Sequence, residues 1–65
     1  MLYRIECLKK DGSLHYALET TCFYQARGHY WGAEVNPEIA EVVCKVDYHD
    51  GKGMQELGRR TTNHN

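Results

Sequence analysis

Three side chains in the middle of the chain, Tyr24, Arg27 and Trp31, have the types and the spacing of a binding surface. Positions i, i+3 and i+7 lie on one flank of a helix, so a helix here would present the three side chains together. Trp, Tyr and Arg are enriched at the energetic centres of protein interfaces, because each brings a large amphipathic surface. The alternative is that Trp31 folds under the edge of a sheet and closes a small core, with Tyr24 as an isolated surface tyrosine.

The cysteines are predicted to be reduced thiols rather than parts of a disulfide or metal site. They number three, at Cys7, Cys22 and Cys44, whereas a disulfide framework needs an even count. Cys7 and Cys44 fall on apolar faces of predicted strands, where free cysteine packs as a small hydrophobic residue. Structural zinc favours ligands in close pairs, and Cys44 with His49 has no second pair to accompany it. We therefore expect no metal and no other cofactor.

The remaining arrangements that could support catalysis are weak. Gly51 and Gly53 follow a strand and precede no clear helix, so the context of a phosphate-binding loop is missing. Spacing leaves a nucleophilic Cys–His pair open, because such residues meet in space rather than in sequence. A chain this short, however, leaves little room for an enclosed pocket. The sequence predicts a protein that is not an enzyme, in which two carboxylate pairs are solvated surface: Glu38 and Glu41, and Asp47 and Asp50.

Length and composition narrow the possible classes. Sixty-five residues form one domain with one small core, and 42% hydrophobic and 26% charged residues are typical of a folded globular chain. The formal net charge of −1 implies no global attraction to nucleic acid or to a membrane. No apolar run approaches the roughly 18 residues of a membrane span, and the N-terminus lacks the layout of a signal peptide. We expect a cytoplasmic protein.

The first elements that must position these residues form a β-hairpin. Residues 2–8 and 13–19 alternate between apolar and polar side chains, as half-buried strands do. Asp11-Gly12 between them is a strong hairpin signal, because both residues tolerate the positive φ of primed turns. The side chains expected to face the core are Tyr3, Ile5 and Cys7 in the first run and Leu14, Tyr16 and Leu18 in the second.

A helix of about ten residues follows the hairpin. Thr20-Thr21 offers a hydroxyl cap, and from Cys22 the apolar period changes to about 3.6. The stripe expected to face the core consists of Cys22, Phe23, Ala26 and Tyr30. Gly28 in the interior lowers the intrinsic helix propensity, so packing against the sheet has to hold this helix.

The second half of the chain contains a third strand within residues 39–48 and a turn at 50–53. The side chains expected to face the core are Val42, Cys44, Val46 and Tyr48. Residues 54–57 could form a short fourth strand, whereas residues 58–65 hold no apolar side chain and are expected to be a flexible tail. The outer face of the sheet is expected to carry cross-strand ion pairs among Arg4, Glu6, Glu19, Glu41, Lys45 and Asp47.

These elements predict an α+β fold, a two-layer sandwich of order β-β-α-β with a possible last β. One helix then packs on a three- or four-stranded sheet. Residues 1–57 form the single domain, and residues 58–65 form the tail. The helical crossover leaves two arrangements open: the third strand runs parallel to the second, or antiparallel to the first at the other edge.

The layout resembles that of small phage-encoded inhibitor proteins, such as phage inhibitors of host RNA polymerase and compact anti-CRISPR proteins. The hairpin of residues 3–7 and 14–18 carries the resemblance, together with Glu19-Thr20-Thr21 before the helix, the aromatic helix ending at Tyr30-Trp31, and the strand of residues 42–48. The resemblance implies a host–virus interaction in which the protein occludes or distorts a larger partner, such as a polymerase or a CRISPR effector, without catalysis.

The predicted function is therefore a protein-binding module, an inhibitor or adaptor. It would use Tyr24, Arg27 and Trp31 or an exposed sheet edge, since an edge strand can extend a partner's sheet. The alternative is a nucleic-acid-binding accessory protein, in which Arg59-Arg60 or Lys9-Lys10 would add phosphate attraction. A homodimer formed through a sheet edge is compatible with either function.

Overall fold

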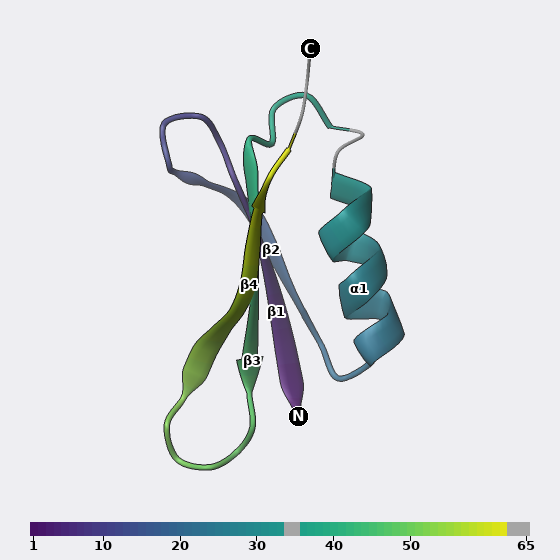
Figure 1. Ribbon diagram of the computed structural model, residues 1–65, viewed down its shortest axis with the longest axis vertical. Helices are drawn as coiled ribbons and strands as arrows, with labels where there is room; N and C mark the ends of the chain where they lie inside the picture. Colours follow the sequence, from purple (N-terminus) through teal and green to yellow (C-terminus); the bar gives the residue numbers. More distant parts are fainter. Residues whose placement is uncertain (34–35, 63–65) are drawn as a thin grey trace.

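The computed structural model describes residues 1–33 and 36–62, which form one four-stranded sheet and one helix. Figure 1 shows the sheet nearly edge-on, with the helix lying along one face. The α+β sandwich expected from the sequence is confirmed. The elements in chain order are β1 (Leu2–Leu8), β2 (Leu14–Thr20), α1 (Phe23–Gly32), β3 (Glu41–Asp47) and β4 (Met54–Thr61).

The sheet has the order β2-β1-β3-β4, and every neighbouring pair is antiparallel. Of the two arrangements left open by the sequence, the structure has the second: α1 carries the chain across β1, and β3 pairs on its far side. In the middle of the sheet, Ile5 pairs with Leu18 on one side and with Cys44 on the other. The order leaves β2 and β4 as the two edges of the sheet.

The core lies between α1 and the inner face of β1 and β3. Ala26 is the helical residue buried there, at 2% exposure, while Tyr30 is half-buried against the core. The predicted helical stripe is wrong for Cys22 and Phe23, which are exposed. Cys22 is the N-cap residue, before the first helical turn, and the exposed ring of Phe23 lies edge-on to that of Tyr3 at a centroid distance of 5.9 Å. The buried hydrophobic cluster is Tyr3, Ile5, Cys7, Ala26, Ala33, Ile39, Val42 and Val46.

Three side chains expected to face the core, Leu14, Tyr16 and Tyr48, are exposed instead. Cys7 pairs with Tyr16 but Leu8 pairs with Leu14, so the strand carries one extra residue and Leu14 turns to the outer face. Tyr16 is the third residue of β2, close to the turn between β1 and β2, and Figure 1 shows this turn bending away from α1. Tyr48 lies beyond the end of β3 at Asp47, outside the alternation that predicted its direction.

The predicted domain end at residue 57 and the flexible tail are wrong for residues 58–62. β4 continues to Thr61 and pairs with β3 along its length. Thr62 is buried, donates its hydroxyl to the carbonyl of Ile39 at 2.5 Å, and donates its backbone N–H to Ala40. Backbone hydrogen bonds to β3 require no apolar side chains. A segment without apolar residues can therefore still belong to the sheet. Residues 63–65 lie outside the described chain.

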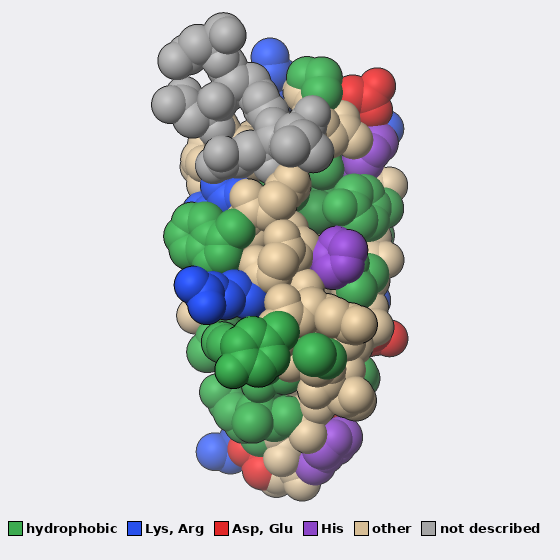
Figure 2. All heavy atoms as spheres, turned by 90° about the vertical axis from the view of Figure 1, so that its right-hand side faces the viewer, with side chains coloured by type: hydrophobic (Ala, Val, Ile, Leu, Met, Phe, Trp, Pro, Cys, Tyr) green, Lys and Arg blue, Asp and Glu red, His purple; other side chains and the backbone are tan. Residues whose placement is uncertain are grey.

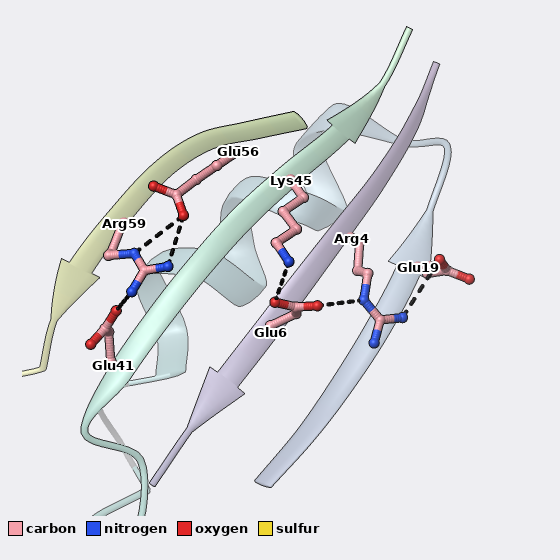
Figure 3. Close-up of polar contacts among 7 residues, drawn as sticks. All are labelled: Arg4, Glu6, Glu19, Glu41, Lys45, Glu56 and Arg59. Carbon is pink, nitrogen blue, oxygen red and sulfur yellow. Dashed lines mark hydrogen bonds and ion pairs between the residues drawn. The ribbon is translucent and has the colours of Figure 1, made fainter. Parts of the chain in front are cut away.

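The outer face of the sheet carries the cross-strand ion pairs expected from the sequence (Figure 3). Glu6 accepts from Arg4 at 2.8 Å and from Lys45 at 3.0 Å, and Arg4 also approaches Glu19 at 3.6 Å. Hydrogen bonding from Arg4, and then the ammonium of Lys45, hold the pKa of Glu6 below its ordinary value. The expected participant Asp47 instead accepts a hydrogen bond from the backbone N–H of His49.

A second group on this face joins β3 to the longer β4. Arg59 donates to Glu41 on β3 and to Glu56 on its own strand, the latter at 2.8 Å. Val43 lies on the same face, because it pairs with Glu6 and with Arg59, and it is only 1% exposed. The charged side chains therefore shield an apolar centre as well as pairing with one another.

Candidate functional site

The helix that carries the predicted binding residues is fixed at its start by polar contacts from the end of β2. The hydroxyl of Thr20 accepts the backbone N–H of Cys22 at 3.1 Å and donates to the side chain of Gln25 at 2.9 Å. The predicted threonine contribution is therefore present, but Cys22 rather than either threonine occupies the N-cap position. The small side chain of Ala26 then lets α1 approach the sheet closely.

Arg60 of β4 fixes the other end of the helix. Its Nε donates to the carbonyl of Tyr30 at 3.0 Å, and one terminal nitrogen donates to the carbonyls of Tyr30 and Trp31 at 2.8 and 3.0 Å. The guanidinium also lies 4.9 Å from the ring centroid of Trp31 and 5.5 Å from that of Tyr30. A cation at a helix C-terminus satisfies carbonyls that the helix cannot pair and complements the negative end of the dipole.

A groove of about 250 Å³ opens between α1 and β4. Phe23, Arg27 and Trp31 line its helical side, Leu57 and Gly58 line its β4 side, and Tyr3 and Cys44 contribute from the sheet. Figure 2 looks onto the helical face and shows hydrophobic side chains gathered along one flank, with a cationic side chain among them. The lining is mostly apolar, with Arg27 as its charged member.

The three predicted binding residues are all on the surface, but only two of them line the groove. Trp31 is 60% exposed and lines the groove beside Arg27, so it does not fold under the sheet edge. Tyr24 is 78% exposed and lies outside the lining, with its ring edge-on to Phe23 at a centroid distance of 5.8 Å. Tyr24 therefore extends the apolar surface away from the groove.

Sequence reasoning missed Phe23, Leu57 and Arg60 as contributors to this surface. Phe23 is 52% exposed and Leu57 is 55% exposed. The sequence predicts Phe23 in the stripe that faces the core and Leu57 at the end of the short fourth strand that residues 54–57 could form. Leu57 is the extra residue of a bulge, because Cys44 pairs with Gly58 while Lys45 pairs with Glu56. Neither the bulge nor a contact across thirty residues between Arg60 and Tyr30 leaves a local signal in the sequence.

The groove lining includes one thiol, that of Cys44. Burial raises the pKa of the Cys44 thiol, which favours the unreactive protonated form. The described residues that line the groove include no histidine to activate that thiol. Across residues 1–33 and 36–62, no group of three or more His, Cys, Asp or Glu side chains is placed to hold a metal ion. Among the described elements, there is likewise no helix long and apolar enough to cross a membrane.

Comparison with known proteins adds no assignment to this geometry. No family model, curated protein or solved structure matches the chain. The candidate site therefore rests on the described residues themselves.

Proposed function

We propose that this chain is a small non-catalytic protein-binding module, an inhibitor or adaptor that occludes a larger protein partner. The observation that carries the proposal is the apolar groove beside α1. Three large apolar side chains that are each more than half exposed, Phe23, Trp31 and Leu57, converge there around one cation, Arg27. Contiguous exposed apolar surface of this kind is typical of sites where another molecule binds.

The size of the groove favours a protein partner over a small-molecule substrate. Pockets that enclose small molecules usually exceed about 300 Å³, whereas this groove measures about 250 Å³ and is open to solvent. A volume of this size accepts one or two side chains of a partner. The aromatic and arginine lining matches the residue types that dominate the energetics of protein interfaces.

The anchoring of the helix also supports a recognition role. The three hydrogen bonds from Arg60 and its stacking against Trp31 hold the indole in place before any partner arrives. A surface that is already ordered loses little conformational entropy on binding, which increases affinity. Trp31 therefore forms a prepared contact rather than a mobile side chain.

The nucleic-acid alternative has less support. It relied on Arg59-Arg60 in a mobile tail or on Lys9-Lys10 at the hairpin tip. Lys9 and Lys10 are exposed, but both arginine guanidinium groups make contacts within the fold. An arginine that bonds carboxylates or helix carbonyls gives less electrostatic attraction to a phosphate backbone than a solvated one. The protein-binding function is the one that the arrangement of these side chains supports best.

The test is affinity capture with three baits: the unaltered chain, Trp31→Ala, and the matched control Tyr48→Ala. Both substitutions remove an exposed aromatic ring, but Tyr48 lies in the turn after β3 and outside the groove lining. Circular dichroism first establishes that all three baits are folded. We expect a protein that the unaltered chain and the Tyr48 variant retain and that the Trp31 variant loses. Equal recovery on all three baits would show that the groove is not the binding surface.

A further inference from the structure

β4 is an edge strand that the rest of the described chain leaves open. It pairs with β3 on one side only, and α1 packs chiefly against β1, β2 and β3. The backbone groups along the far side of an edge strand can pair with another strand, and natural proteins either protect such edges or use them. A strand that pairs with β4 along its whole length has to match the side-chain pattern of β4.

The bulge in β4 determines which of its side chains share a face. Beyond the bulge, Gly58 and Arg60 pair with Cys44 and Val42, whose side chains belong to the inner face. Before the bulge, Gln55 pairs with Val46 and is also on the inner face. By the same register, the outer-face residues of β4 are Met54, Glu56, Arg59 and Thr61. The extra residue, Leu57, lines the groove on the inner side.

A second copy of β4 matches this pattern in its antiparallel, fully overlapping register. That register pairs the first residue of the strand with the last, and so on inward: Met54 with Thr61, Gln55 with Arg60, Glu56 with Arg59, and Leu57 with Gly58. In a regular strand of eight residues, these partners would face opposite sides of the sheet, because side chains alternate with a period of two. The bulge shifts the alternation by one residue, and every pair then lies on one common face.

The charges and side-chain sizes in this register are also complementary. Glu56 lies opposite Arg59 of the second copy, and the two-fold symmetry repeats the pair on the other side of the axis. Opposite charges directly across two strands stabilise the pairing. On the inner face, Leu57 lies opposite Gly58, which has no side chain to collide with it; a Cβ placed on Gly58 would lie 3.5 Å from the hydroxyl of Tyr30.

We propose that the chain forms a symmetric homodimer through antiparallel pairing of β4 with β4 in this register. The two sheets then join into one sheet of twice four strands, and both α1 helices lie on its same face. The two grooves open toward each other across the paired β4 strands. The inference does not depend on the proposed function, because it rests on the edge of β4 rather than on Arg27 and Trp31.

The experiment measures the dissociation constant of the dimer by sedimentation equilibrium for the unaltered chain and for charge-reversal variants. Glu56→Arg and Arg59→Glu each replace attraction with repulsion across the axis, whereas the double variant Glu56→Arg/Arg59→Glu restores opposite charges. Glu19→Arg is the matched control for Glu56→Arg, because it makes the same change of net charge on the far edge strand β2. Circular dichroism and urea unfolding establish that each variant is folded.

We expect the unaltered chain to dimerise and each single reversal to weaken the dimer about tenfold or more. The double variant should return to within about threefold of the unaltered chain, as expected when the same two partners exchange charges. The Glu19 variant should dimerise like the unaltered chain. A chain that stays monomeric at millimolar concentration, a dimer that the single reversals leave unchanged, or a folded double variant that does not recover would each overturn the proposal.

Discussion

Removing the Arg60 side chain tests how the structure holds the C-terminal end of α1. Arg60→Ala removes three hydrogen bonds to the last carbonyls of α1 and a cation stacked on Trp31 and Tyr30. Water can replace part of the bonding, so the hydrogen bonds account for about 1 kcal/mol net. Stacking of a cation on an aromatic ring adds about 0.5 kcal/mol, and the helix dipole adds about 0.5 kcal/mol.

We therefore expect Arg60→Ala to lower the free energy of unfolding by about 2 kcal/mol. A domain of this size holds only about 3–5 kcal/mol, so the loss is close to half of its stability. Urea unfolding, followed by the fluorescence of the single tryptophan, Trp31, and by circular dichroism, measures it. With a slope near 1 kcal/mol per molar urea, the midpoint should fall by about 2 M.

Two further variants separate the roles of the arginine. Arg60→Lys keeps the charge but loses the planar fork, so its stability should lie between those of Arg60→Ala and the unaltered chain. Lys52→Ala is the control, because it removes an exposed cation from the turn between β3 and β4, outside the groove and outside β4. If Lys52→Ala and Arg60→Ala shift the midpoint equally, Arg60 does not anchor α1.

Three other measurements test different parts of the structure. Iodoacetamide should modify exposed Cys22 first and Cys44 more slowly, because burial raises the pKa of Cys44. Mass spectrometry of digests measures the two rates, and equal rates would contradict this prediction. The pKa of Glu6 is lowered in the fold, so its stabilising effect is complete well above its ordinary pKa of 4.5 and is lost as the pH falls through the lower folded pKa. Urea titrations should show that the free energy of unfolding falls less at acid pH for Glu6→Gln than for the unaltered chain. Truncation after residue 57 removes half of β4 and should abolish cooperative unfolding, whereas a chain that still unfolds cooperatively would restore the tail interpretation.

The elements of this fold were predictable because each has a local pattern. Three patterns predict the hairpin and the helix, and the structure has both elements. The patterns are the alternation over residues 2–8, Asp11-Gly12, and the change of period after Cys22. Three of the failures share a physical cause. Backbone bonding between strands, which side-chain hydrophobicity does not report, decides three features: the extra residue before Tyr16, the extra residue Leu57, and the pairing of residues 58–61.

The candidate site was predictable in part for the same reason. Helical spacing alone places Arg27 and Trp31 on one flank, and the structure puts both at the groove. The sequence could not show that Leu57 and Gly58 form the opposite side, since that contact joins segments about thirty residues apart. It also could not show that Arg60 donates hydrogen bonds to carbonyls of α1 instead of being solvated in a tail.

The most direct test of the central claim, that the groove beside α1 binds a protein partner, is the affinity of an identified partner for three folded baits. Isothermal titration compares the unaltered chain, Trp31→Ala and Tyr48→Ala. We expect Trp31→Ala to weaken binding by at least about thirtyfold, since a central tryptophan is worth about 2 kcal/mol or more, and Tyr48→Ala to bind like the unaltered chain. Equal affinities for all three baits would contradict the claim.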